Sequence, residues 1–428
     1  MTTSAITPTL KERWAWAFYD WANSAFITTV VVAFFPIFFR QYWASELPSE
    51  QVTLHLGTAN ALASLSVMLL APFLGAVADR GGIKKPIMAA FVTLGVCATL
   101  LLTVIGEQQW QLALFAFVLA VIGFLGANIF YDSLLVDVSE EKDFNRVSAL
   151  GYGLGYLGGG LLFLLCVLMT LHPEWFGIAD KTSAVRWAFG ISAVWWAVFS
   201  IPLWLLVHQR KTAVPSQQRP PVKTLLVGGW RDFIDTFNHI RQLKAVGLFL
   251  LAYWFYIDGV DTIIVMSIDY GQTLGFPEDS LITALLITQF IAFPAAILFG
   301  YLGNKLGAKK GILIGLVAYI IITLGASQMQ TVKGFYALAI CVGLVQGGIQ
   351  ALSRSLYASL IPVEQSAKFF GFYNMLGKFA AVLGPLLVGW FGLLTGSSRL
   401  GLMAVLILFI AGGILLWFVP TKESSKTN

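Results

Sequence analysis

The chain has 428 residues, of which 57% are hydrophobic and only 11% are charged. A soluble protein of this length needs more polar side chains to cover its surface, so the composition excludes a soluble globular protein and indicates a chain that lipid surrounds. The formal net charge of +5 does not indicate a nucleic-acid partner, because the basic residues lie mainly in short segments between apolar runs.

Twelve apolar runs follow one another with short polar turns between them, and each has about the 20 residues that a membrane-spanning helix needs. The first six cover residues 14–39, 54–78, 86–105, 112–136, 147–171 and 184–207. The second six cover residues 243–268, 281–302, 311–328, 335–360, 369–394 and 400–419. Because the runs are continuous and do not alternate as barrel strands do, we expect an all-α membrane protein with twelve transmembrane helices.

The basic residues predict the orientation of the chain. Most of the 27 Lys and Arg lie on the side of the predicted membrane that carries both chain ends. Positive residues stay on the cytoplasmic side, so we expect both termini in the cytoplasm. Asp20 interrupts the first apolar run and no small-residue cleavage site follows it, which indicates a retained first helix and not a cleaved signal peptide.

The cysteines and histidines do not form a metal-binding pattern. The three cysteines, Cys97, Cys166 and Cys341, all fall within apolar spans, which is typical of small buried hydrophobic residues. The four histidines lie in or near loops, and no His-Glu-x-x-His sequence is present. We therefore expect no metal site and no cofactor.

The longest polar stretch, residues 208–242, divides the chain into two bundles. We expect an N-terminal six-helix bundle over residues 1–207 and a C-terminal six-helix bundle over residues 243–428. From Val222 onward, apolar residues in the linker recur at helical spacing with charged residues between them. This pattern predicts a helix on the cytoplasmic membrane surface, and a regulatory or partner-binding helix is the alternative.

Three sequence matches across the linker indicate that the two bundles are copies of one unit. The segment GAVADRGGIKK at 75–85 matches GYLGNKLGAKK at 300–310. The segment FYDWANSAF at 18–26 matches YIDGVDTII at 256–264. A third match joins the fourth and fifth helices with the tenth and eleventh. The two bundles are therefore expected to be pseudo-symmetric.

These segments carry a resemblance to a known family. Segment 75–85 contains Gly-x-x-x-Asp-Arg-x-Gly followed by basic residues, and it resembles the loop signature of the major facilitator superfamily, although Ile83 stands where that signature usually has Arg. The runs at 19–26, 155–160, 256–263 and 346–356 resemble the vacuole-effluxer-like branch, whose fungal members are known as vacuolar amino-acid exporters. The short loops suit a bacterial member, which implies a multi-pass protein of a bacterial inner (plasma) membrane.

The resemblance implies that the loop after the second helix controls conformation and does not choose the solute. Asp79 would lie near a helix N-terminus, where the positive end of the helix dipole favours its charge, and basic residues of the loop would pair with acids such as Asp137. The expected switch residues are Gly75, Asp79, Arg80, Gly82, Lys84 and Asp137. In the second copy Asn304 replaces the acid, so a charged relay is not expected there.

Ionisable residues inside the predicted spans are the main candidates for transport, because a charge at the bilayer centre costs about 2.5–3.5 kcal/mol on insertion scales. Asp20 and Asn23 share one face of the first helix, and Asp258 and Asp261 share one face of the seventh. In members of the superfamily these helices face each other across a central cavity. We expect both pairs to line the solute path, and the alternative is that they only hold helices together.

Three of these charged groups have more specific expected roles. Two nearby carboxylates repel each other, so Asp258 or Asp261 is a candidate proton carrier. Either could instead hold the ammonium group of an amino acid, while Lys378, near the middle of the eleventh helix, receives its carboxylate. A permanent ion pair with an aspartate is the alternative for Lys378.

Asp132 and Arg354 occupy corresponding positions in the fourth and tenth helices, near the cytoplasmic end, and have opposite charges. We expect this pair to act as a gate that closes the cytoplasmic side in the outward-open state and separates in the inward-open state. The alternatives are a static buried ion pair, separate satisfaction by backbone groups, and direct binding of an anionic solute group by Arg354.

Together these features predict a secondary active transporter of a small polar solute, in the first place an amino acid, that works by alternating access. Proton coupling remains open, and a sugar, a peptide fragment or a drug is the alternative solute. The expected partners are the solute, protons and the lipid bilayer. A non-transporting sensor is a more remote alternative. An intramembrane aspartyl protease is not expected, because Tyr19-Asp20 and Tyr131-Asp132 each match only half of its signature.

Overall fold

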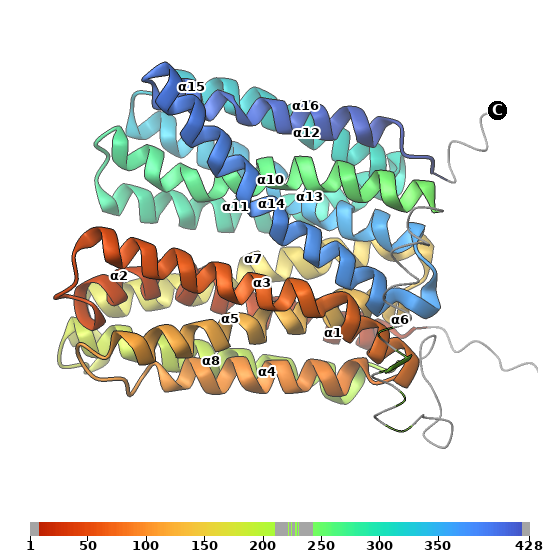
Figure 1. The fold of residues 1–428 in the computed structure, drawn as a ribbon, viewed down its shortest axis with the longest axis horizontal. Coiled ribbons are helices and arrows are strands. Elements are labelled where there is room, and N and C mark those ends of the chain that lie inside the picture. Colours follow the sequence, from red (N-terminus) through yellow and green to blue (C-terminus); the bar gives the residue numbers. More distant parts are fainter. Residues whose placement is uncertain are drawn as a thin grey trace, which may run out of the picture.

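The fold was obtained as a computed structural model of the chain. The structure describes residues 8–209 and 243–421, together with the single positions 221, 224, 227, 228 and 230. All regular elements of this described part are helices (Figure 1). The surface helix predicted from Val222 onward lies almost entirely outside the described residues.

The N-terminal half contains six long helical segments. The first runs from Leu10 to Trp43 and changes its hydrogen-bond pattern three times, as α1 (Leu10–Ala25), the π-helix η1 (Phe26–Phe34), α2 (Phe35–Phe38) and the π-helix η2 (Phe39–Trp43). The others are α3 (Ser49–Gly81), α4 (Lys84–Leu101), α5 (Trp110–Ser133) with the short α6 (Leu135–Val138), α7 (Phe144–Leu171) and α8 (Lys181–Leu206).

The C-terminal half repeats this arrangement. Its helices are α10 (Lys244–Thr273), α11 (Glu278–Leu306), α12 (Ala308–Gln328), α13 (Val332–Leu360), α14 (Ser366–Thr395), and α15 (Ser398–Met403) followed by α16 (Val405–Trp417). Short 3₁₀ turns lie at Glu141–Asp143, Pro173–Phe176 and Val363–Gln365.

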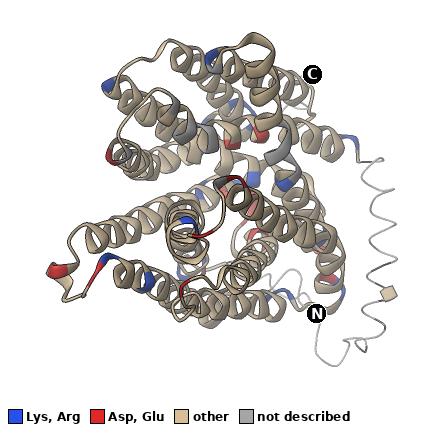
Figure 2. Ribbon diagram, turned by 60° about the vertical axis from the view of Figure 1, so that its left-hand side comes forward, with Lys and Arg blue, Asp and Glu red and all other residues tan. Residues whose placement is uncertain are grey.

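Eleven helical segments of the described chain are long and apolar enough to cross a bilayer. The 30-residue helix α14 supplies a further long helix, which includes the shorter apolar stretch Gly384–Thr395. Each of the twelve predicted spans overlaps one of these helical segments, and the predicted all-α membrane fold is confirmed. Charged residues are sparse along the helices (Figure 2), as a lipid-facing surface requires.

The two halves lie side by side, with the first half in red to yellow and the second in green to blue (Figure 1). Between them, α7 packs on α11 and α13, and α14 packs on α3 and α5. The helix α1 begins and α16 ends at the same end of the bundle (Figure 1), which we call the terminal end. Segments 75–85 and 305–310 also lie at this end, because each follows an even number of membrane crossings.

The first helix starts at a well-defined cap. The Thr9 hydroxyl accepts a hydrogen bond from the Glu12 N–H at 3.3 Å, and the Glu12 carboxylate accepts from the Thr9 N–H at 2.8 Å, which is a capping box. From Phe26 the helix becomes π-helical, with wider turns than an α-helix. This change follows directly after the turns that carry Asp20 and Asn23. The helix face with these two polar residues is therefore next to the π-helix.

Candidate functional site

A central cavity of about 360 Å³ lies between the two halves. Helices α1, α5 and α7 form its wall on one side, and α10, α11, α13 and α14 form it on the other. Six of the residues singled out from the sequence line it: Asp20, Asn23, Asp132, Asp261, Arg354 and Lys378. Uncharged polar side chains complete the wall, including those of Ser24, Thr28, Asn128, Gln289, Gln346, Gln350 and Asn374.

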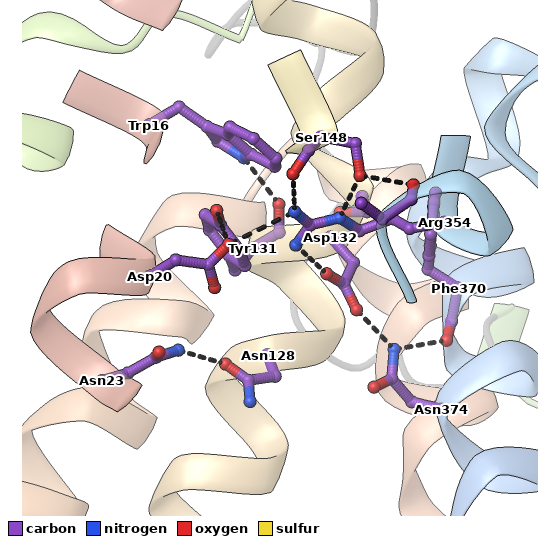
Figure 3. Close-up of polar contacts among 12 residues, drawn as sticks. Trp16, Asp20, Asn23, Asn128, Tyr131, Asp132, Ser148, Arg354, Phe370 and Asn374 are labelled. Carbon is purple, nitrogen blue, oxygen red and sulfur yellow. Dashed lines mark hydrogen bonds and ion pairs between the residues drawn. The ribbon is translucent and has the colours of Figure 1, made fainter. Parts of the chain in front are cut away.

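Arg354 on α13 joins the two halves at the cavity. Its Nη1 lies 3.0 Å from Asp132 Oδ1, and its Nη2 lies 3.2 Å from Asp20 Oδ2 (Figure 3). The Nε group donates to Ser148 Oγ at 2.9 Å, and Nη2 donates to the Ser148 carbonyl at 2.9 Å. The predicted gate pair is therefore in direct contact, and Asp20 is a third charged member of the same cluster.

Aromatic rings surround the guanidinium. The Arg354 Cζ atom lies 4.3 Å from the ring centroid of Tyr152, 4.8 Å from that of Trp16 and 5.3 Å from that of Tyr131. These are cation–π distances. The Arg354 side chain is only 1% exposed, and two carboxylates and three rings compensate its charge in this dry position.

Neutral side chains orient the two carboxylates. Tyr131 Oη donates to Asp20 Oδ2 at 2.7 Å, and Asn374 Nδ2 on α14 donates to Asp132 Oδ2 at 3.1 Å (Figure 3). Sequence reasoning did not single out Tyr131, Ser148 or Asn374 for this cluster, because uncharged polar residues are common in transmembrane helices. The only sequence signal for Tyr131 was its position next to Asp132.

Asn23 lies on the cavity wall one turn beyond Asp20. Its Nδ2 donates to Asn128 Oδ1 on α5 at 2.6 Å (Figure 3). This bond uses an N–H of Asn23 and the carbonyl oxygen of Asn128, so the amino group of Asn128 stays available to a polar solute in the cavity.

Asp261 on α10 and Lys378 on α14 also face the cavity, but they differ from the arginine cluster. Among the described residues, neither side chain has a hydrogen bond or a salt bridge within 4 Å. The cavity therefore presents a carboxylate and an ammonium group that are available to a ligand.

Asp258 is placed differently from Asp261. It is fully buried and is not among the residues that line the cavity. Its carboxylate accepts from the Gly384 N–H of α14, with Oδ2 at 2.9 Å and Oδ1 at 3.0 Å. A separation of three residues turns a side chain by about 60° around a helix axis, and this rotation directs Asp261 to the cavity and Asp258 to α14.

The loop after α3 contacts the start of α14. Asp79 Oδ1 accepts from the Ala367 N–H at 3.1 Å, and Asp79 Oδ2 accepts from the Lys368 N–H at 2.8 Å. These N–H groups belong to the first turn of α14, where no intrahelical acceptor is available. Asp79 therefore caps a helix of the other half, where the positive end of the helix dipole also favours its charge.

Lys84 connects this cap to the rest of the loop. Its Nζ lies 3.6 Å from both Asp79 Oδ1 and Asp137 Oδ2, and it donates to Ser366 Oγ at 2.7 Å. The Lys84 and Asp137 side chains are completely buried. One ammonium group thus lies between two carboxylates and contacts the other half through Ser366.

Glycine is needed at two positions of segment 75–85, for different structural reasons. A Cβ atom on Gly75 would overlap the backbone of Ala367, so only glycine lets α3 approach α14 this closely. Gly82 ends α3 in the left-handed conformation, with φ 59° and ψ 36°. Arg80 lies in the last turn of α3, at the negative end of its dipole.

Comparison with known proteins gives the family. The family described as "Vacuole effluxer Atg22 like" matches residues 56–142 and 136–428. The chain belongs to this family. The uncharacterized MFS-type transporter YxiO of Bacillus subtilis is 41% identical over 420 residues, which cover 98% of this chain and 97% of the relative. Autophagy-related protein 22-2 of Aspergillus clavatus is 28% identical over 279 residues, which cover 59% of this chain and 44% of that protein.

Solved structures show the fold of this Atg22-like chain. The proton:xylose symporter XylE has a TM-score of 0.74 at 12% identity, covering 96% of this chain and 95% of the symporter. The human organic anion transporter MFSD10 has a TM-score of 0.71 at 13% identity, covering 95% of this chain and 99% of that one. The Atg22-like chain therefore has the major facilitator fold. The expected transporter, as opposed to an enzyme, is confirmed by its relatives.

Proposed function

We propose that this major facilitator transporter moves an amino acid across the membrane by alternating access. The observation that carries the proposal is the pair formed by Asp261 and Lys378, which face the cavity without a hydrogen bond or salt bridge to other described residues. Unpaired charges are costly in a membrane protein and tend to be kept for function. The ammonium group of an amino acid fits Asp261, and its carboxylate fits Lys378.

The Arg354 cluster supports a gating role in this cycle. It joins α13 and α14 of one half to α1, α5 and α7 of the other, on the terminal side of the Asp261 position. The capped α14 and the Lys84 network add contacts between the halves at the same end. While these contacts are formed, the terminal end is closed. The contacts separate when the cavity opens to the terminal end.

A second contact joins the halves at the cavity wall, on the side away from the terminal end. Gln289 Nε2 on α11 donates to Thr28 Oγ1 of η1 at 2.8 Å. Thr28 lies past the midpoint of the Leu10–Trp43 segment, and Gln289 lies in the first half of α11, so this bond is on the side opposite the terminal end. It is the candidate outer gate of the same cycle.

The location of the basic residues supports a cytoplasmic terminal end. The relative in Bacillus subtilis supports a bacterial inner (plasma) membrane as the location. The description of the family as vacuole effluxers supports export as the direction. Coupling to protons is part of the proposal, because carboxyl groups of Asp20, Asp258 and Asp261 lie in or beside the solute path.

A sugar is the second candidate solute. The cavity wall carries the amide groups of Gln289, Gln346, Gln350 and Asn128, and Gln346 Oε1 is buried without a hydrogen-bond partner among the described residues. Amide groups suit the hydroxyls of a neutral polar solute. A solute of this kind would not need Asp261 and Lys378, which is why the amino acid is preferred.

A thermal-shift screen of the purified protein against amino acids, dipeptides and sugars tests the proposal. A ligand present at 100 times its Kd stabilises the folded state by about 2.7 kcal/mol. We expect an amino acid to raise the unfolding temperature, and Asp261→Asn and Lys378→Ala to abolish this effect. Asp279→Asn and Lys333→Ala are matched controls at exposed positions and should keep it. Stabilisation by a sugar that both site variants retain would replace the proposed solute.

A further inference from the structure

Helix α14 has an irregular point in its middle. Pro385 lacks an N–H, and its ring excludes the carbonyl group four residues earlier, so one bond of the helical ladder is missing there. The N–H of the preceding residue, Gly384, donates to both carboxylate oxygens of Asp258 on α10. A bond that is missing from the ladder at a proline is a usual origin of a bend in a helix, and the N–H next to it contacts a side chain of another helix.

The packing at this point requires glycine. A Cβ atom on Gly384 would overlap the Thr262 hydroxyl and would lie 2.9 Å from Asp258 Oδ1. Thr262 Oγ1 also donates to Asp258 Oδ1 at 3.5 Å. The backbone of α14 therefore packs directly against the carboxylate of Asp258.

The surroundings of Asp258 contain little that could balance a negative charge. No salt bridge to Asp258 within 4 Å occurs in the described part of the chain, and the residue is fully buried. On its own helix the neighbouring acid is Asp261, three residues further along. The neighbouring stretch of α16, Val405–Trp417, has no ionisable side chain.

The helices α13 and α14 each add one cation near Asp258, and neither cation is in direct contact with it. On α14 the nearest ionisable group is Lys378, which lies at the cavity. On α13, Arg354 is bound by Asp20 and Asp132. The neutral Ser353 of α13 is hydrogen-bonded to Tyr256 of α10. The Gly384 N–H is thus the main group that stabilises the charged form of Asp258.

The hydrogen bonds described between α14 and the N-terminal half lie on the N-terminal side of Gly384 and Pro385. The N–H groups of Ala367 and Lys368 bind Asp79, and Asn374 binds Asp132. The helix crosses obliquely from the second half and reaches α3 of the first half with this segment (Figure 1). A change in the bend at Gly384 and Pro385 would move these contacts together.

We infer that Asp258 is a proton-binding site that controls the bend of α14 and, through it, the closure of the terminal end. The charged carboxylate holds the Gly384 N–H in a charge-assisted bond, which is roughly twice as strong as a neutral one, and α14 keeps the bend that places its first turn on Asp79. This inference rests on the alternating access proposed above, but it does not depend on which solute is carried.

The proton step follows from the same geometry. A proton that enters through the cavity, where Asp261 is the neighbouring acid on α10, converts the Asp258 carboxylate to the neutral acid. The bond to Gly384 weakens, and the first part of α14 leaves Asp79 and Asp132. The proton is released again when the bend re-forms and the N–H returns to the carboxylate, so protonation and opening of the terminal end favour each other.

Distance measurements between two spin labels test this inference. Labels at Lys142 and Glu364, both exposed at the terminal end, report the separation of the halves in a protein whose three cysteines are replaced by Ala. We expect acidification to raise the ratio of long to short distances, by up to about tenfold per pH unit within the titration range. Asp258→Asn should give mainly long distances at every pH, and Asp258→Glu should restore the response.

Two further variants show whether the response depends on Asp258 and on the bend of α14. Asp261→Asn keeps Asp258 and should still respond to pH, whereas Pro385→Ala restores a helical N–H and should reduce the response while Asp258 remains. A pH response of Asp258→Asn equal to that of the wild type would overturn the inference, as would a wild-type distance distribution that does not change with pH. The thermal shift with amino acids is a separate measurement. A wrong solute assignment can therefore be distinguished from a wrong assignment of Asp258 as the group that controls the bend of α14.

Discussion

Arg354 of α13 and Asp132 of α5 are 222 residues apart in the chain, and their Nη1 and Oδ1 atoms lie 3.0 Å apart. The same guanidinium binds Asp20 on α1, so a single side chain of the C-terminal half holds two helices of the N-terminal half. Both carboxylates also receive a hydrogen bond from a neutral residue, Tyr131 or Asn374. The cluster is therefore a compact connection between the halves, in which one guanidinium is shared by two carboxylates.

Replacing Arg354 with Ala should open this connection. It leaves Asp20 and Asp132 buried without a cation, and removing one partner of a buried ion pair costs about 3–5 kcal/mol. We expect a lower unfolding temperature and a loss of solute transport of at least about tenfold, since tenfold corresponds to only about 1.4 kcal/mol. Transport into proteoliposomes and thermal unfolding measure the two effects.

Arg354→Lys distinguishes charge from geometry. An ammonium group is a point charge and cannot form the fork that binds two carboxylates at once, so an intermediate loss is expected. Lys333→Ala, at an exposed position, is the control and should behave as the wild type. Full transport by Arg354→Ala would show that the cluster does not take part in the cycle.

Asp79→Asn should weaken closure of the terminal end. The carboxylate accepts from two N–H groups of α14, whereas an amide has one acceptor oxygen and no charge to interact with the helix dipole. We expect the closed form to lose about 1–2 kcal/mol, the usual worth of a helix cap, and the spin-label distance across the terminal end to lengthen. Asn304→Ala, at the exposed equivalent in the second copy, should leave the distance unchanged.

Much of this arrangement was predictable from the sequence, because ionisable residues are rare inside membrane helices and are conspicuous there. Asp20, Asp132, Asp261, Arg354 and Lys378 could be singled out for that reason, and all five line one cavity. The twelve spans were predictable because lipid imposes long apolar runs. The position of Asp79 at a helix N-terminus was implied by the resemblance of its loop to the major facilitator signature.

The rest of the site depends on how the helices pack, which cannot be read from the residue types alone. Ser148 and Asn374 are neutral residues like many others in the helices, and only packing brings them to Arg354 and Asp132. The π-helix Phe26–Phe34 has no distinctive residue pattern. Asp258 and Asp261 look equivalent in sequence, but a rotation of about 60° around the helix separates a buried carboxylate from one at the cavity.

Gln289→Leu should loosen the side of the cavity opposite the terminal end. It removes the 2.8 Å bond to Thr28 and keeps a side chain of similar length. We expect a cysteine introduced at Ile27, on the cavity wall, to react several-fold faster with a membrane-impermeant maleimide, because a single interhelical hydrogen bond in a membrane is worth about 0.6 kcal/mol on average.

Thr28→Val removes the other partner of this bond and should have a similar effect. Thr283→Val, which alters an exposed threonine on the same helix as Gln289, is the control. If the labelling rate at Ile27 is the same in Gln289→Leu, Thr28→Val and the wild type, the contact between Gln289 and Thr28 does not restrict access from the opposite side.

Gly75→Ala should prevent close approach of α3 and α14 without changing any charge. The added Cβ atom would overlap the Ala367 backbone, so the helices must separate at the terminal end. Gly57→Ala is a matched control on the same helix, because a Cβ there has no atom within 4 Å, and it should be neutral or stabilise by about 0.5–1 kcal/mol. We expect only Gly75→Ala to lengthen the spin-label distance and slow transport. Equal behaviour of the two variants would mean that the cycle does not require this contact, and closure would then depend on the Arg354 cluster and the Asp79 cap alone.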